Sequence, residues 1–318
     1  MTKGDQGAGF RMLRFALLRI LSAIPTLLLV VVLAFLMAHA APGGPFDDER
    51  VLPPENARNL EAAYHLDESL PRQFARYLSG ALRGDLGPSY YYRDYSVSEL
   101  IGAALPLSLE LGLLAMCVAL VVGIIAGVAA ALRRNALADR VISALAISGI
   151  SIPVFVVAPL LVFVFAVELR WLPASFSGGS SGSRLILPVV ALALPQIAYV
   201  TRLTRASMLE VLSSDFVRTA RAQGLSTFSV VRYHAMKPAM LPLVSYLGPA
   251  IAAVLTGAVV VETVFGIPGL GQLFVKSGLN RDYTLVLGIV IFYAALIIVL
   301  NLLVDLMYGF LDPRIRHR

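Results

Sequence analysis

The chain has 318 residues, of which 58% are hydrophobic and 14% charged, with a formal net charge of +6 and a mean hydropathy of +0.79. Soluble domains carry about a quarter charged residues, and a water-soluble protein of this size could not bury so much apolar surface. The composition excludes a soluble globular protein, a disordered chain and a disulfide-rich secreted fold. It predicts an integral membrane protein.

Six apolar runs are long enough, or nearly so, to cross the roughly 30 Å of hydrocarbon that about 20 helical residues span. In chain order they cover residues 20–37, 105–132, 141–167, 185–200, 239–261 and 285–311. The fourth run is short, and we expect it to continue through residues 201–203, with Arg202 and Arg205 reaching the membrane interface. Prolines inside the runs are tolerated where neighbouring helices satisfy the freed backbone groups, which indicates a packed bundle.

The first run follows several basic residues and ends in Ala38-His39-Ala40, a pattern that resembles a secretory signal peptide and its cleavage site. The run is longer than the roughly 7–15 apolar residues of such a peptide, and five further runs follow it. We therefore expect an uncleaved first helix.

Lysine and arginine are concentrated in the N-terminal segment, in the loops after the second and fourth runs, and at the C-terminus. Because basic residues are enriched in short cytoplasmic loops, both termini are expected in the cytoplasm. The predicted organisation is a cytoplasmic N-terminus at residues 1–19, a six-helix membrane region at 20–311 with an extracytoplasmic loop at 41–104 and a cytoplasmic loop at 201–238, and a cytoplasmic C-terminus at 312–318.

The extracytoplasmic loop 41–104 is acidic, with an amphipathic stretch at residues 55–70 and a run of tyrosines at residues 90–92. It would serve either as a small cap packed on the helix ends or as a docking surface for an extracytoplasmic partner, and composition favours the cap. Farther along, residues 266–271 have glycine spacing like that of a phosphate-binding loop. No predicted strand precedes them and no Lys-Ser/Thr pair follows, so a turn at a helix end is favoured.

The cytoplasmic loop 201–238 contains the signals of two short helices. Ser214 or Asp215 can cap the first, which covers residues 216–223, and Gly224 can end it in a left-handed conformation. A second helix is expected at residues 226–237.

One face of the first short helix is apolar, through Phe216, Val217 and Ala220, while Arg218 and Arg221 stand away from it. An amphipathic helix can lie on anionic lipid, normally through a larger apolar face with several bulky residues, whereas a small face such as this one suits a groove of another protein. The residues alone leave both interpretations open.

Chemistry-bearing motifs are scarce. No H-E-x-x-H occurs, none of the four histidines falls at the centre of a run, and no G-x-x-x-x-G-K-[ST] is present. The acidic residues nearest the runs lie toward their ends, Glu110 and Glu262 at the outer and Asp305 at the inner end, whereas a proton-coupled carrier needs an acid near the midplane. A metal site, an intramembrane enzyme and an ATP site on this chain have little support.

The segment Asp215-Phe216-Val217-Arg218-Thr219-Ala220-Arg221-Ala222-Gln223-Gly224-Leu225 resembles the EAA loop of bacterial ABC importer permeases, in particular the dipeptide and oligopeptide branch. The general pattern has Glu-Ala-Ala where this chain has Arg218-Thr219-Ala220, a variation usual in the peptide branch. The likeness continues over residues 23–27, 41–43, 84–87, 185–188, 234–239, 261–271, 280–283 and 311–314. Residues 52–55, 64–66, 93–97 and 271–275 are similar to the B-type permease of oligopeptide importers.

This resemblance implies an all-α permease with the type I ABC importer fold in the inner (cytoplasmic) membrane, forming a path for oligopeptides or dipeptides. It implies a second homologous permease subunit, two ATP-binding subunits and an extracytoplasmic peptide-binding protein as partners, with membrane lipid around the spans and no nucleic acid. The chain itself would bind no cofactor, because ATP and Mg would act on the partner subunits.

The site residues follow from the same resemblance. The coupling helix to the ATPase would comprise Asp215, Phe216, Val217, Arg218, Thr219, Ala220, Arg221 and Gly224. A docking surface for the binding protein would include Glu262, Gly266, Pro268, Gly269 and Gly271. The alternative function is a stand-alone secondary carrier of peptides or other small solutes.

Overall fold

The computed structural model describes the backbone of residues 3–40, 67–178 and 182–311 and the side chains of residues 17–40, 67–178 and 182–304. This described part is helical, and its only extended pairing is an isolated bridge between Pro88 and Ser96. Most of the amphipathic stretch expected at residues 55–70 lies outside the described residues. Five helices are long and apolar enough to cross a membrane, or six if one bent pair counts as a span, which confirms an all-α membrane protein.

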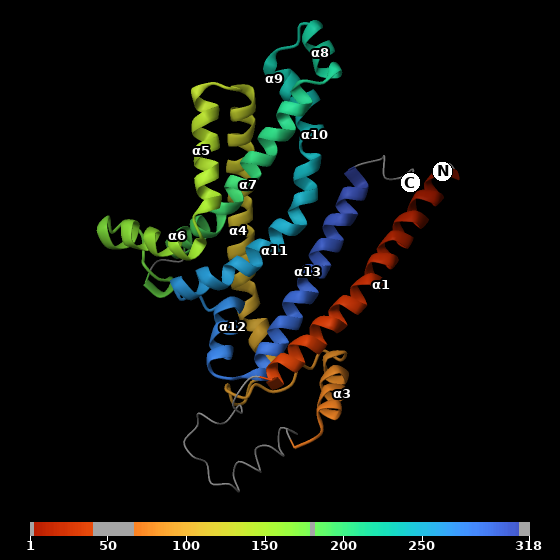
Figure 1. Cartoon of the computed structure of the whole chain (residues 1–318), viewed down its shortest axis with the longest axis vertical. Coiled ribbons are helices and arrows are strands. Elements are labelled where there is room, and N and C mark those ends of the chain that lie inside the picture. Colours follow the sequence, from red (N-terminus) through yellow and green to blue (C-terminus); the bar gives the residue numbers. More distant parts are fainter. Residues whose placement is uncertain (1–2, 41–66, 179–181, 312–318) are drawn as a thin grey trace. The chain divides into compact units, whose positions relative to one another are not determined.

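The elements follow one another along the chain as labelled in Figure 1. They are α1 (Lys3–Ala40), α3 (Leu70–Ala81), α4 (Val97–Leu132), α5 (Leu137–Ser151), α6 (Val154–Leu161), the π-helical η1 (Val162–Glu168), the 3₁₀ turns η2 (Phe176–Gly178) and η3 (Ser183–Leu185), α7 (Ile186–Leu212), α8 (Asp215–Ala222), α9 (Thr227–Ser229), the π-helical η4 (Val230–Ala235), α10 (Met236–Ala239), α11 (Leu241–Phe265), α12 (Leu270–Leu279) and α13 (Tyr283–Leu311).

The third apolar run is broken. α5 ends at Ser151, Ile152 is extended (φ −91°, ψ 118°), and α6 with η1 continues after a bend of 104°. The cause is Pro153, because the residue before a proline is driven out of the helical region and proline itself has no amide hydrogen to donate. The prediction of one uninterrupted helix over residues 141–167 is therefore wrong.

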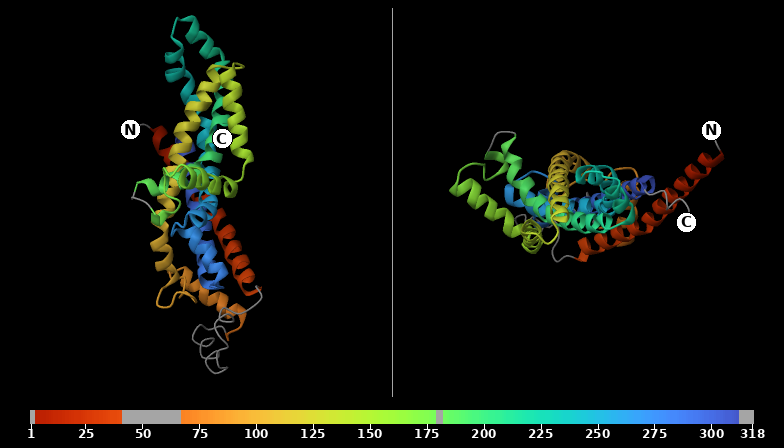
Figure 2. Two further views of the ribbon diagram at one scale, coloured as in Figure 1. Left: turned by 90° about the vertical axis from the view of Figure 1, so that its left-hand side faces the viewer. Right: turned by 90° about the horizontal axis from the view of Figure 1, so that it is seen from above.

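The chain forms two compact units. Unit 1 comprises Met1–Ile20, Ser108–Ile267 and Ile297–Arg318, and unit 2 comprises Leu21–Leu107 and Pro268–Leu296. Within unit 1, α7 is the most enclosed span: 61% of its most apolar window is buried, against 33% or less in the other four. It contacts both α5 and α11, and Figure 2 shows it running alongside α5.

Close approach of α4 and α5 to α7 depends on glycine. A Cβ added at Gly123 would lie 2.7 Å from the Val200 Cβ, and one added at Gly127 would lie 2.7 Å from the carbonyl oxygen of Thr201. Residues four apart share a helix face, and small residues at this spacing let membrane helices pack backbone to backbone. On α5, a Cβ at Gly149 would lie 3.2 Å from the Cβ of Ala198.

In unit 2, two apolar clusters hold the helices together. One joins the start of α4 to α12 and α13 through buried residues Val97, Ile101, Ala104, Leu270, Leu285 and Ile289. The other joins α1 to α13 through Val31, Phe35, Leu287 and Ile291, and Phe74 and Tyr77 of α3 pack against it. Helix α3 thus covers the α1–α13 cluster as a cap would, and this burial raises the pKa of the Tyr77 hydroxyl above its usual value.

We expect Gly127→Ala to destabilise the protein by about 1–3 kcal/mol, because the new methyl group has no room against α7. Gly102→Ala is the matched control on the same helix, since a Cβ there meets nothing within 4 Å. The melting temperature of the detergent-solubilised protein measures both. Equal melting temperatures for the two variants would contradict the close approach.

Candidate functional site

The candidate site is the segment between α7 and α11, residues 213–240, which Figure 1 shows extending beyond the last turn of α7 in unit 1. Helix α8 begins at Asp215 after an extended Ser214, whose hydroxyl donates to the carbonyl of Val211 (2.6 Å) instead of capping α8. Gly224 follows α8 with φ +82°, as the sequence predicts. At this φ a residue with a side chain is strained.

The second predicted helix of the segment is present in three parts. Ser226 caps α9 by accepting a hydrogen bond from the amide of Ser229 (3.3 Å). The helix then widens into the π-turn η4 before α10. Turns of this kind are rare and frequently lie at functional sites.

The apolar face of α8 is largely covered by the chain itself. Val217 is fully buried and Ala220 is 3% exposed, and both pack with Val230 of η4. A helix of eight residues is not stable alone in water, so this contact holds α8 in place. Of the apolar face predicted from the sequence, only Phe216 is exposed, while Val217 and Ala220 are turned toward Val230.

The outward side of the segment carries aromatic and basic residues. We call Phe216 (49% exposed), Leu225 (38%), Phe228 (74%) and Tyr233 (72%) the exposed apolar set. The Arg232 guanidinium lies 5.7 Å from the centre of the Tyr233 ring, and Arg218 pairs with Asp215 at 3.3 Å. Exposed aromatic residues with arginine neighbours are typical anchors of protein–protein interfaces.

Sequence reasoning missed Phe228 and Tyr233. A signal was available, since Phe228 lies four residues before Arg232 and Tyr233 directly follows it, in a loop expected in water.

The inner side of the segment packs against the spans α4 and α7. Val231, Ala235 and Ala239 form one buried cluster with Ala131 of α4 and Met208 of α7. A close-packed interior transmits displacement between the residues that share it, so this cluster connects the segment to the adjoining ends of α4 and α7.

An ion pair joins α5 to α7 in the same region. Arg205 donates from Nε to Asp139 Oδ1 (2.5 Å) and from Nη2 to Oδ2 (2.8 Å), and Asp139 is 3% exposed. Asp139 also accepts from the amide of Asn135 (2.9 Å). A bidentate arginine–carboxylate pair of this kind fixes the orientation of the two side chains as well as neutralising their charges. The sequence did not predict this pair, in which Asp139 holds the Arg205 guanidinium against α5.

The residues expected to receive a binding protein differ in burial. Gly266 ends α11 with φ +65°, and the amide of Ile267 donates to the carbonyl of Glu262 (2.8 Å), which confirms a helix-end turn. Glu262 is fully buried and accepts from the hydroxyl of Ser108 (2.7 Å), so it ties α11 to α4. Gly269 and Gly271 are buried as well, whereas Gly266 and Pro268 are exposed.

Asp282 is a further buried carboxylate, one that sequence reasoning missed. It accepts hydrogen bonds from the hydroxyls of Ser89 and Thr284 and the amides of Tyr90, Tyr91 and Leu285. This network fixes the tyrosine run in unit 2. Burial, followed by the neighbouring Tyr91 and Asp282, raises the pKa of the Tyr92 hydroxyl.

Residues suited to metal binding do not gather in the described part of the chain: no group of three or more histidine, cysteine, aspartate or glutamate residues is found there. The side chain of Asp305 lies outside the described residues.

Two family models match the chain. The "Binding-protein-dependent transport system inner membrane component" matches residues 119–317, and the corresponding N-terminal component matches residues 12–111. Among curated relatives, the oligopeptide transport system permease protein OppB of Salmonella typhimurium is 49% identical over 306 residues, which is 96% of this chain and all of the relative. The dipeptide transport system permease protein DppB of Bacillus subtilis is 42% identical over 96% of this chain and 98% of its own length.

Solved structures share the fold. The inward-facing MetNI methionine ABC transporter aligns with a TM-score of 0.58 at 17% identity, over 67% of this chain and 96% of the matched chain. An amino acid ABC transporter solved with histidines aligns with a TM-score of 0.51 at 21% identity, over 66% and 94%.

We expect Asp139→Asn to lower the free energy of unfolding by about 3 kcal/mol, because it leaves the Arg205 charge unpaired against α5. The double variant Asp139→Asn/Arg205→Gln should recover part of that loss. Asp215→Asn is the control and should leave the melting temperature unchanged, since its ion pair with Arg218 is exposed. A double variant no more stable than Asp139→Asn would contradict this reasoning.

Proposed function

The chain belongs to the family of binding-protein-dependent transport system inner membrane components, and from that premise we propose that residues 213–240 dock on an ATP-hydrolysing partner that drives peptide import. The protein is a multi-pass permease of the inner membrane. Membership of this ABC importer family supports a permease subunit over the stand-alone secondary carrier.

The observation that carries the proposal is the two-sided nature of the 213–240 segment. Its inner side is packed on α4 and α7, while its outer side exposes the apolar set Phe216, Leu225, Phe228 and Tyr233. Covering one such side chain contributes about 1.5–3 kcal/mol. A groove on a partner protein would supply that cover.

Lipid is the other surface that the segment could meet. A helix on a membrane presents a broad face of bulky apolar residues, but α8 turns Val217 and Ala220 inward and leaves Phe216 among charged neighbours. This supports a protein groove.

Force applied to the segment would reach the spans through fixed contacts. The cluster around Met208 links the segment to α4 and α7, and the Asp139–Arg205 pair links α7 to α5. ATP and Mg would be bound by two partner ATPases. Their closure can switch the path from inward-facing to outward-facing only by favouring one state over the other.

The remaining partners in the proposal are a second homologous permease, which completes the path, and an extracytoplasmic peptide-binding protein. The exposed Gly266 and Pro268 are the residues of the predicted outer surface that remain accessible to it. Peptides are the proposed substrate because relatives named as oligopeptide and dipeptide permeases match almost the whole chain.

Reconstitution tests the transport proposal. The complete complex in proteoliposomes, with its binding protein, is expected to take up trialanine only when ATP is supplied. Uptake by this chain alone, driven by a proton gradient without ATP, would instead establish a secondary carrier.

Phe216→Asp and Phe228→Asp are each expected to abolish ATP-dependent uptake and to reduce co-purification of the ATPase, because each places a charge where the partner's groove would cover an aromatic ring. Gly224→Pro should have the same effect, since proline cannot adopt the φ of +82° at that position. All three should insert into the membrane normally. Leu82→Asp, at an exposed leucine outside the segment, is the matched control. Normal uptake by the Phe216 and Phe228 variants would refute the docking surface.

A further inference from the structure

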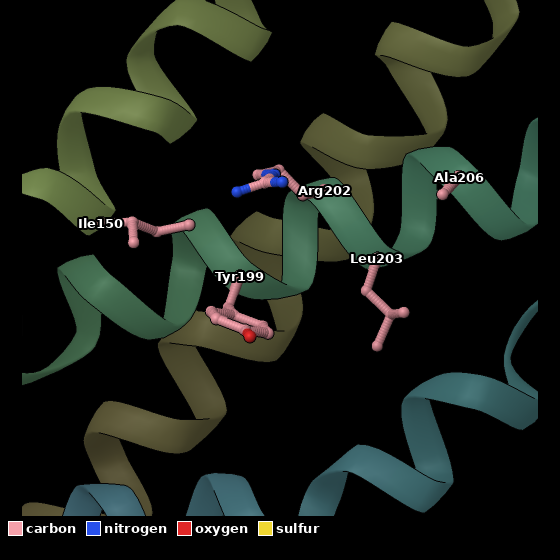
Figure 3. Close-up of a pocket in the computed structure, with 5 residues that line it drawn as sticks. All are labelled: Ile150, Tyr199, Arg202, Leu203 and Ala206. Atoms are coloured by element: carbon pink, nitrogen blue, oxygen red, sulfur yellow. The ribbon is translucent and has the colours of Figure 1, made fainter.

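One face of α7 lines a cavity that has no role in the proposed docking of residues 213–240 on an ATPase. Tyr199, Arg202, Leu203 and Ala206 repeat at the spacing of a single helix face, and Ile150 of α5 completes the lining (Figure 3). The cavity has a volume of about 260 Å³, and its lining is apolar except for the Tyr199 hydroxyl and the Arg202 guanidinium. This volume is below the roughly 300–1,000 Å³ of sites that enclose a whole small molecule, so it suits one end or one residue of a larger substrate.

Arg202 differs from its neighbour Arg205. Arg205 forms an ion pair with Asp139. Arg202 is exposed and makes no hydrogen bond or ion pair with any described residue. It lies about 15 Å from the last residue of α7, taking 1.5 Å per residue. A charged side chain that faces a bundle interior or a water-filled path costs less than one that faces lipid.

Another part of the cavity lining, Tyr199, is aromatic and held in place by its neighbours. The rings of Tyr199 and Tyr246 of α11 stack at 4.9 Å with an interplanar angle of 5°. The Tyr246 hydroxyl donates to Gln196 Oε1 (2.9 Å) and so fixes the pair. Tyr199 remains half exposed on the side of the cavity. A cation and a fixed aromatic ring that line the same cavity suit an anionic group attached to an apolar or peptide body.

We propose that Arg202 binds a carboxylate of the peptide as it passes through the permease, while the Tyr199 ring packs against the adjoining residue. This rests on the proposed peptide transport. Guanidinium matches carboxylate with two parallel hydrogen bonds, and the absence of a partner within the described chain leaves both donor positions available. One exposed arginine gives weak, reversible binding, which passage requires.

A peptide presents carboxylates at its C-terminus and on acidic side chains, and three probes separate these sources. They are trialanine, trialanine amide, and the amide of alanyl-aspartyl-alanine. Each is supplied at a concentration that saturates the binding protein, to the complete importer in proteoliposomes. The initial rate of ATP-dependent uptake is measured for the wild type and for Arg202→Gln and Arg202→Lys.

Arg202→Gln is expected to slow trialanine uptake about tenfold, as the loss of one charge-assisted contact would, and to leave trialanine amide within about twofold of the wild type. Arg202→Lys should fall between, because lysine keeps the charge without the planar fork. A matching loss for the aspartyl amide identifies any carboxylate as the ligand. A loss confined to trialanine identifies the C-terminus.

Arg134→Gln removes one exposed positive charge outside this face and is the matched control. Equal loss for all three probes in Arg202→Gln, or no loss, would overturn the assignment. So would failure of that variant to assemble with the second permease, which would make this face a subunit contact. A wild-type complex whose ATP hydrolysis responds to the binding protein but which imports none of the probes would refute peptide transport itself, and the carboxylate assignment with it.

Discussion

The close approach of α4 to α7 at Gly123 and Gly127 is the constraint on which unit 1 depends. Lipid tails are as apolar as the helices, so burial gives no drive for spans to associate. Close packing and polar pairs must supply it. Two glycines four residues apart let α4 lie against the backbone of α7. That contact makes α7 the enclosed helix to which the other elements of the unit attach.

Polar contacts then hold in place the helices that pack closely through these glycines. Asp139 and Arg205 join α5 to α7, and Ser108 and Glu262 join α4 to α11. An unpaired charge in this region costs several kcal/mol, so each pair specifies one arrangement of its helices. The 213–240 segment is continuous with α7 at one end and α11 at the other. In the proposed coupling, a pull on its outer side would pass to helices that these contacts already join.

Hydropathy predicted the spans well because a helix crossing lipid must satisfy its own backbone and needs about 20 apolar residues to do so. It did not predict the break at Pro153, since prolines also occur inside membrane helices, where neighbours satisfy the freed groups. Pro159 lies inside α6 and Pro195 inside α7, in the same chain. Whether a proline bends a span sharply depends on packing that no local pattern records.

The candidate site was also predicted only in outline, because the details of its packing depend on residues that are distant in sequence. Periodicity showed which face of α8 is apolar, but the burial of Val217 depends on Val230, which the chain brings back against α8 through η4. Glu262 looked hydrated from its position near a helix end, yet its partner Ser108 is 154 residues away in sequence. The full set of donors around Asp282 is likewise assembled from two distant segments. Sequence identifies polar residues, whereas their partners follow from tertiary packing.

Arg202 and Arg205 make the same point within a single helix turn. The two are identical in type and three residues apart, and both were expected to reach the interface. Asp139 on the neighbouring helix neutralises one of them and leaves the other with its charge uncompensated among the described residues. A guanidinium that serves only to hold helices together needs a carboxylate of the same chain. Arg202 has no such partner among the described residues, so its guanidinium can bind a ligand that comes and goes, as we propose for a peptide carboxylate.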